Sequence, residues 1–223
     1  ISHTTLVSIF LPLFILPWVS LSLGVRSYWK SVGGSKLALS DLKTAFSSAA
    51  SMKNLSGGQG QGCNYESTER YTHNRRWAHH ATMYGFLLCF ASTSVATVLH
   101  YVFNMPAPYS LFSLPKLLGI SGGLLLSYGT FMLALLKWKS DSALGSVSRT
   151  SGEYAFIGLL FLVSTTGLIL YWSSGTSFAT GWLVFHLALV ATFFISIPYS
   201  KMVHGIFRIA ALSREAQIQR LAG

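Results

Sequence analysis

The chain has 223 residues, of which 51% are hydrophobic and only 10% are charged, and its 16 Lys and Arg against 6 Asp and Glu leave a formal net charge of +10. Ordinary soluble domains carry roughly 25% charged residues. The composition therefore excludes an ordinary soluble enzyme and a disordered tail, and it indicates an integral membrane protein with one basic side. Two cysteines, Cys63 and Cys89, are too few to ligate an iron–sulfur cubane.

Five apolar stretches are long enough to cross the roughly 30 Å of hydrocarbon in a bilayer, which takes about 20 residues. Because lipid offers no hydrogen-bond partners to the backbone, each stretch should be a helix. We therefore expect an all-α fold, a membrane bundle of about five transmembrane helices forming one domain over residues 1–223. The expected spans are residues 1–25, 77–103, 117–136, 154–172 and 182–203.

The first stretch contains two prolines, and a long linker follows it. Pro12 and Pro17 lie inside the first, which leaves open that this segment re-enters the membrane without spanning it. A linker rich in Gly and Ser, residues 26–76, separates the first apolar stretch from the second. Within that linker, Ser40 is a candidate cap for a short helix with Leu42, Phe46 and Ala49 on one face. This segment is either an amphipathic helix at the membrane surface or a half-ordered loop.

The basic residues predict the orientation. Fifteen of the 16 Lys and Arg lie in residues 26–76, in residues 137–153 or in the tail from Lys201, and only Lys116 flanks the other side. Loops rich in Lys and Arg stay in the cytoplasm. We expect a multi-pass protein of a bacterial inner membrane, with the linker and the C-terminus cytoplasmic and with anionic lipid against the basic side.

Histidines near the span ends are candidate metal ligands, since ionisable groups in membrane spans are costly and usually functional. On the fifth span, His186 and His204 are 18 positions apart. At about 100° per residue this is five turns, which places both side chains on one helix face about 27 Å apart.

The second span offers the matching residues. His79 and His100 are 21 positions apart and fall near one face, especially on a supercoiled helix, whereas His80 and His100 fall on opposite faces. The face argument favours His79 as the ligand, and His80 stays open because the first turn of a span is easily irregular.

The helix directions then pair these residues by depth. Antiparallel second and fifth spans place His79 or His80 with His204 near the inner face, and His100 with His186 near the outer face. Neutral imidazole is a good axial ligand for iron, and helical bundles hold such cofactors in their cores. We predict two b-type haems, each between two histidines. The competing interpretation is that each histidine is an ordinary residue of the membrane interface.

Three basic residues lie beside the inner histidines. Arg75, Arg76 and Lys201 are candidate partners for haem propionates, and equally they are anchors of the basic membrane face. The chain shows no phosphate loop, no zinc spacing and no nucleophile–base arrangement, and we expect no nucleic-acid partner.

Four segments resemble a known family, tricarballylate (citrate) utilisation protein B. Residues 75–90 read RRWAHHATMYGFLLCF, and residues 62–65, 114–119 and 198–205 read GCNY, LPKLLG and PYSKMVHG. The His186 to His204 spacing and the Pro-x-Ser-Lys-x-x-His run are more loosely similar to the gamma subunit of respiratory nitrate reductases, a transmembrane dihaem cytochrome.

The resemblance implies a function. Such a protein takes electrons from the reduced flavin of a partner, an FAD-dependent dehydrogenase such as tricarballylate dehydrogenase, and passes them to the quinone pool. It is an electron-transfer component and not a stand-alone enzyme. Family members also carry an N-terminal ferredoxin-like domain with iron–sulfur clusters. That domain is absent from this chain, which we expect to be the membrane part.

Two other interpretations remain. A haem-free membrane anchor would dock the dehydrogenase through residues 26–76, and its histidines would be replaceable. A tricarboxylate transporter would need cationic residues deep in the spans. One conflict also stays open: a cytoplasmic iron–sulfur domain ahead of Ile1 requires either an extra upstream crossing or a re-entrant first segment.

Overall fold

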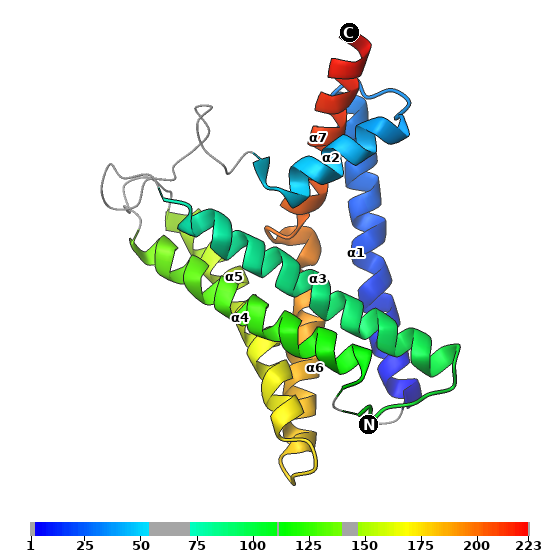
Figure 1. Cartoon of the computed structure of the whole chain (residues 1–223), viewed down its shortest axis with the longest axis vertical. Helices are drawn as coiled ribbons and strands as arrows, with labels where there is room; N and C mark the ends of the chain where they lie inside the picture. Colours follow the sequence, from blue (N-terminus) through cyan, green and yellow to red (C-terminus); the bar gives the residue numbers. More distant parts are fainter. Residues whose placement is uncertain (1–2, 54–71, 111, 140–146, 223) are drawn as a thin grey trace. The chain divides into compact units, whose positions relative to one another are not determined.

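The computed structural model describes residues 3–53, 72–110, 112–139 and 147–222, and within those ranges the regular elements are helices (Figure 1). The motif at residues 62–65 and Arg70 lie outside the described residues. Five helices are long and apolar enough to cross a membrane. The predicted all-α membrane bundle of five spans is therefore confirmed. The helices are α1 (His3–Ser31), α2 (Leu39–Ala50), α3 (Asn74–Tyr101), α4 (Leu114–Lys139), α5 (Val147–Trp172), α6 (Ala179–Ser196) and α7 (Val203–Ala222).

The chain divides into two compact units, which are described separately. One unit contains residues 63–190, and the other contains residues 1–62 together with residues 191–223. The division falls inside α6, so the first three turns of that helix belong to one unit and its end belongs to the other.

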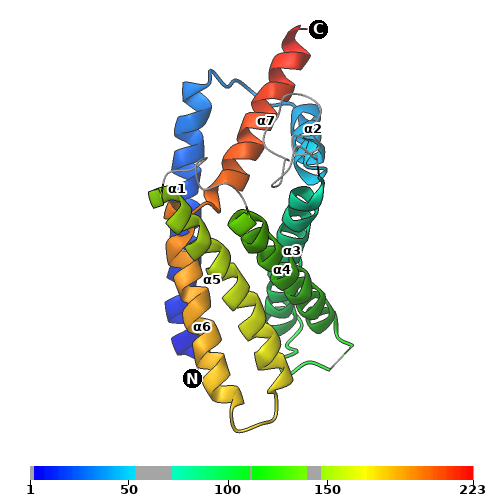
Figure 2. The ribbon, with the colours of Figure 1, turned by 90° about the vertical axis from the view of Figure 1, so that its left-hand side faces the viewer.

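In the unit of residues 63–190, α3 and α4 form an antiparallel pair with very close backbones (Figure 2). Glycine makes this approach possible. A Cβ atom on Gly85 would lie 2.4 Å from the Leu126 nitrogen, one on Gly122 would lie 2.7 Å from the Cys89 nitrogen, and one on Gly129 would lie 2.5 Å from the Thr82 nitrogen. Small residues at such seams let membrane helices pack without a hydrophobic driving force. Gly85 therefore faces the neighbouring helix α4.

Polar contacts join α4 to α5. Near the middle, the Ser127 hydroxyl donates to the Ser164 hydroxyl oxygen at 2.8 Å. At one end Lys137 forms an ion pair with Glu153. At the other end the ammonium of Lys116 lies 5.1 Å from the ring centroid of Tyr171. This cation–π contact gives a partner to the one cationic side chain that the sequence places away from the basic side.

In the other unit, α1 continues without a break through Pro12 and Pro17. Its 29 residues extend about 43 Å at 1.5 Å per residue, which is enough to span a bilayer. The helix does not turn back within residues 3–25, so the described part of this segment does not show the re-entrant alternative. Near its end, α1 packs against α7, where a Cβ on Gly24 would lie 3.2 Å from the Phe207 ring.

The short helix predicted in the linker exists as α2, but its start and its buried face differ from the prediction. Ala38 occupies the N-cap position in place of Ser40, and its backbone N–H donates to the Asp41 carboxylate at 2.9 Å. Asp41 and Ala45 form the buried side of α2, and Phe46 is exposed. The reason is that α2 packs on α7 within this unit, and α7 offers polar partners to Asp41 (Figure 1).

The fifth span ends earlier than predicted. The helix expected over residues 182–203 is α6, which ends at Ser196, and a single 3₁₀ turn, Ile197–Tyr199, follows it. Pro198 lacks a backbone N–H, and its ring disfavours the helical conformation of the residue before it. Ser200 is extended, and a new helix, α7, begins at Val203.

Candidate functional site

The first two turns of α3 carry four of the predicted site residues. Arg75 and Arg76 lie in the first turn and are half-buried. His79 follows the buried Ala78 and is itself half-buried.

His80 has different neighbours, although it follows His79 directly. Its ring centroid lies 6.0 Å from that of Trp77 and 5.9 Å from that of Tyr84, both exposed aromatic residues of the same helix. An aromatic belt of this kind is typical of a membrane–water interface. The choice between His79 and His80 as a ligand stays a prediction.

At the other end of α3, His100 is the penultimate residue of the helix. It is half-buried, and its ring lies 4.8 Å from the ring of Tyr101 in an edge-to-face arrangement. His100 and His186 belong to the same compact unit, together with His79 and His80.

His186 has the most defined surroundings of the predicted ligands. It lies in the second turn of α6, and its Nδ1 is 2.9 Å from the hydroxyl oxygen of Thr166 on α5. Gly167 makes room for the ring, since a Cβ there would lie 3.2 Å from the His186 Cε1. Thr166 is buried, with 3% of its surface exposed. The His186 ring is therefore held by α5 through one nitrogen.

His204 lies on a different helix from His186. Because α6 ends at Ser196, the five-turn argument for a shared helix face does not apply, and His204 is an exposed residue in the first turn of α7. Its Nδ1 lies against the backbone carbonyl of Lys201. The structure thus brings His204 to the backbone of Lys201, and it places His204 in the other compact unit from His186.

The surroundings of His186 would suit a ligand to a metal such as haem iron. A ligating histidine typically uses one ring nitrogen for the metal and donates from the other to a protein oxygen, which orients the ring. The Thr166 hydroxyl is such an oxygen at Nδ1, which leaves Nε2 for a metal. Within the described ranges, no three His, Cys, Asp or Glu side chains gather as a metal-binding group. A bis-histidine haem site needs two.

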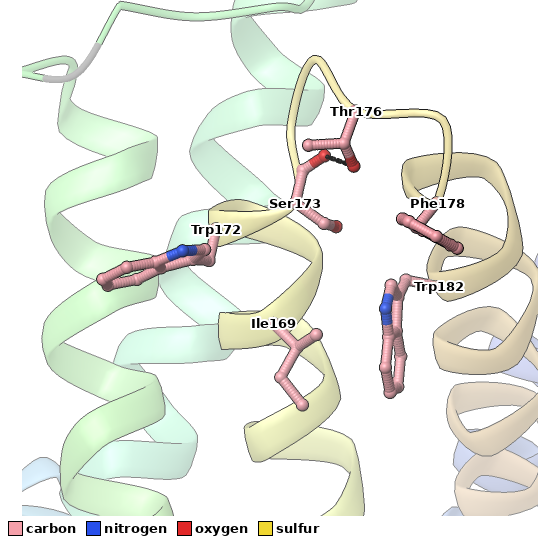
Figure 3. Close-up of a pocket in the computed structure, with 6 residues that line it drawn as sticks. All are labelled: Ile169, Trp172, Ser173, Thr176, Phe178 and Trp182. Carbon is pink, nitrogen blue, oxygen red and sulfur yellow. Dashed lines mark hydrogen bonds between the residues drawn. The ribbon is translucent and has the colours of Figure 1, made fainter.

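An apolar groove lies one helical turn beyond this contact, beside the loop that joins α5 to α6 (Figure 3). It has a volume of about 410 Å³ and is lined by Ile169, Trp172, Ser173, Thr176, Phe178 and Trp182. Ile169 follows Thr166 by three positions, and Trp182 precedes His186 by four, so each pair shares a helix face. The groove is therefore close to His186 and open to the outside of the helix pair.

The sequence reasoning missed Thr166, although a signal was present. Residues 164–167 read STTG, a short polar run in the middle of an apolar span. Hydroxyls in a membrane helix are ordinarily satisfied by a carbonyl one turn earlier, so the run alone did not distinguish a structural role from a contact with another helix.

A second group of polar residues joins α7 to the segment before α2, and the sequence reasoning missed it as well. The fully buried Gln217 donates from Nε2 to the Lys36 carbonyl at 2.9 Å and accepts from Arg214 at 2.6 Å. Arg220 donates to both carboxylate oxygens of Asp41, at 2.8 and 3.1 Å.

This network changes the chemistry of Asp41. The hydrogen bond from Arg220, followed by the one from the Ala38 backbone, holds the pKa of the Asp41 carboxyl below its ordinary value of 3.8. These buried and charge-assisted bonds give the part of the chain outside the spans a defined structure.

Comparison with known proteins gives two matches. The family model described as "Citrate utilization protein B" matches residues 1–223. Citrate utilization protein B of Escherichia coli is 38% identical over 214 residues, which cover 96% of this chain and 56% of that protein. The chain thus spans little more than half the length of this relative. No solved structure matches.

Proposed function

The chain belongs to the Citrate utilization protein B family, and from this premise we propose that it is a membrane electron-transfer subunit with b-type haem. It takes electrons from a reduced flavoprotein dehydrogenase, such as an FAD-dependent tricarballylate dehydrogenase, and passes them to quinone in the membrane. It acts as a component of an oxidoreductase system. Iron–sulfur clusters belong, on this proposal, to a ferredoxin-like domain outside the present residues.

The observation that carries the proposal is the contact between Thr166 and His186 inside two candidate spans. The His186 imidazole is half-buried, and an imidazole that is hydrogen-bonded through one nitrogen is the usual arrangement of a metal ligand. Bound between two such imidazoles, haem supplies a one-electron carrier whose potential the protein tunes. The residues assigned to the two haems are His100 with His186, and His79 or His80 with His204.

The break after Ser196 changes the argument for the second of these pairs. The fifth candidate span ends at Tyr199, and His204 lies beyond it in α7, which begins at Val203. Its depth is therefore inferred from its position after the span and not from helix geometry. The assignments of Arg75, Arg76 and Lys201 to haem propionates remain part of the proposal.

Two features support electron transfer from a flavoprotein on the basic side to an acceptor within the bilayer. The basic residues of segments 26–76 and 137–153 and of the tail from Lys201 offer positive charge to an acidic flavoprotein, and complementary charge steers such encounters. The apolar groove beside His186, with Trp172 and Trp182 among its residues, is within reach of a lipid-soluble acceptor. With the basic side in the cytoplasm, electrons would enter there and leave from within the bilayer of a bacterial inner membrane.

The test is a reduced minus oxidised spectrum of the complete purified protein, produced in cells supplied with haem. We expect a b-type Soret and α-band signal after dithionite, and reoxidation of that signal by a quinone analogue. A folded and monodisperse preparation without Soret absorption would refute the cytochrome assignment.

A second candidate function is a haem-free anchor for the dehydrogenase. It is favoured by the buried polar network of Asp41, Gln217 and Arg220, which builds a defined surface outside the spans without any histidine. Binding of the dehydrogenase to a variant with His186 and His204 both replaced distinguishes the two. If the protein is an anchor, this variant should keep both docking and electron transfer. If the protein is a cytochrome, the variant should still bind the dehydrogenase but no longer transfer electrons.

A transporter is not favoured by the described spans. The cationic side chains of α4 lie at its ends, where Lys116 contacts Tyr171 and Lys137 contacts Glu153 and Tyr154. A carrier for three carboxylates would need such groups deep in the bundle.

A further inference from the structure

The hydroxyl of Thr166 has one hydrogen and three oxygen or nitrogen neighbours. Its Oγ1 lies 2.6 Å from the Leu162 carbonyl one turn earlier, 3.3 Å from the Val163 carbonyl and 2.9 Å from the His186 Nδ1. The shortest of these is the contact with Leu162, at an ordinary distance for an O–H···O bond. The neighbouring Thr165 makes the same kind of bond to the Phe161 carbonyl at 2.7 Å. These distances favour the Leu162 carbonyl as the acceptor of the Thr166 hydrogen.

With its hydrogen committed, the Thr166 oxygen has only lone pairs to offer His186. A hydroxyl oxygen accepts through two lone pairs, and a neutral imidazole carries its single hydrogen on one nitrogen. The contact then requires that hydrogen on Nδ1, with Nδ1–H as the donor. The Thr166 oxygen as acceptor thus places a hydrogen on the side of the ring that faces α5.

Gly167 helps to hold the ring in this position. The virtual Cβ of Gly167 lies 3.2 Å from Cε1 and 3.7 Å from Nδ1 of His186, so the ring lies directly over the α5 backbone. A side chain there would push the ring away from Thr166. Residues 166 and 167 thus act together on one imidazole.

We propose that Thr166 is a positioning residue that fixes His186 as its Nδ1–H tautomer and leaves the Nε2 lone pair as the donor atom for a metal. The identity of that metal as haem iron rests on the proposed function, whereas the tautomer does not. A fixed tautomer and ring orientation lower the cost of ligation, and a hydrogen bond to the far nitrogen makes the ligand more basic.

The chain offers matched variants for the test. Thr166→Val keeps the shape of the side chain and removes the acceptor, and Thr166→Ser restores the hydroxyl. Thr165→Val removes the adjacent hydroxyl, which bonds to its own helix and not to His186. All three changes occur on the same turn of α5.

The first measurement is ¹⁵N NMR of the imidazoles in the complete protein, labelled at histidine and produced in haem-deficient cells, with the His186 signal assigned by its loss in His186→Gln. We expect the Nδ1–H tautomer in the wild type, in Thr166→Ser and in Thr165→Val, and its partial or complete loss in Thr166→Val. An Nε2–H tautomer in the wild type overturns the proposal, and so does an unchanged tautomer in Thr166→Val.

The second measurement is made on the haem-loaded protein. We expect Thr166→Val to weaken haem binding at the site of His186 by about 10- to 100-fold and to raise the midpoint potential of that haem, with rescue by Thr166→Ser and no change in Thr165→Val. Equal haem binding and equal potentials in Thr166→Val and Thr165→Val would count against the positioning role. If no variant binds haem, the proposed function fails while the tautomer measurement still decides the role of Thr166.

Discussion

Two of the candidate ligand histidines have one ring nitrogen next to an oxygen of the protein. His186 has its Nδ1 against a threonine of another helix, and His204 has its Nδ1 against the backbone of its own turn. In both cases Nδ1 contacts an oxygen, and for His186 this leaves Nε2 for another partner. For His186, the contact with a buried threonine of another helix distinguishes it from a histidine that simply faces water at the membrane surface.

A spectroscopic prediction follows for these two residues. We expect His186→Ala and His204→Ala each to remove a different haem component, because an axial ligand lost from one site leaves the other intact. The measurement is the reduced minus oxidised spectrum of each purified variant. His73→Ala, at an exposed position just before α3, is the control. Loss of the same component in both variants would contradict a model with two haem levels.

The second prediction at this scale concerns pH. The pKa of Asp41 is lowered in the folded protein by Arg220 and by the Ala38 backbone. Its stabilising contribution is therefore fully present above the ordinary value of 3.8, and it is lost as the pH falls through the lowered folded value. In thermal unfolding between about pH 6 and pH 3, Asp41→Asn should lose less stability on acidification than the wild type.

The control for the pH experiment is Glu215→Gln, which removes an exposed carboxylate from α7. It should follow the wild-type profile. Equal acid sensitivity in Asp41→Asn and the wild type would show that the pair with Arg220 does not contribute to folding.

Among the helices, the pair α3–α4 is held by backbone contact, whereas α4–α5 is held by side chains. The difference comes from glycine: Gly85, Gly122 and Gly129 leave no room for a Cβ at the first interface. At the second interface, serine hydroxyls, an ion pair and lysine–tyrosine contacts carry the polar interactions. The packing of each helix pair is therefore sensitive to a different kind of substitution.

The glycine seam gives a prediction for stability. Gly122→Ala places a methyl group 2.7 Å from the Cys89 backbone nitrogen, which forces the helices apart and should cost roughly 1–3 kcal/mol. Gly158→Ala on α5 meets no atom within 4 Å, so it should be neutral or stabilising by up to about 1 kcal/mol. The thermal midpoint of the purified protein in detergent measures both. If the two variants are equally stable, the close approach of α3 and α4 is not needed.

For the whole molecule, the distribution of basic residues is the strongest guide to orientation. Five candidate spans and a fifteen-to-one division of Lys and Arg predict that the linker and the C-terminus lie on one side of the membrane. Lys116, the exception, has its charge over the ring of Tyr171. One compact unit also combines residues from both ends of the chain, since α7 packs on α1 and α2.

The orientation can be tested with introduced cysteines in a background that carries Cys63→Ser and Cys89→Ala. Ser174→Cys lies in the loop between α5 and α6, and Ser51→Cys lies just after α2, and both positions are exposed. In intact cells, a membrane-impermeant maleimide should label the first and not the second, because positive loops stay in the cytoplasm. The reverse labelling pattern would contradict the pairing of histidines by depth, because that pairing depends on the helix directions.

Local patterns in the sequence were sufficient to predict the helical fold, the five spans and the family. A long apolar run is a helix in lipid whatever surrounds it, so the five spans and the helical fold were predictable. The family was also predictable, because the segment around residues 75–90 is specific. Pro198 gave a local signal for the break after Ser196, yet the surrounding apolar run outweighed it in the prediction.

What only the tertiary structure decided depends on contacts between helices. Whether Thr166 bonds to its own helix alone or also to His186 depends on how α5 and α6 pack, and no local pattern specifies that packing. The same holds for α2, where the buried side is the one with Asp41 and Ala45 because Arg220, 179 positions away, meets that carboxylate. Hydropathy predicts which residues leave water. It does not predict which polar groups meet, because a hydrogen bond requires two particular atoms within about 3 Å, and only the folded chain brings them together.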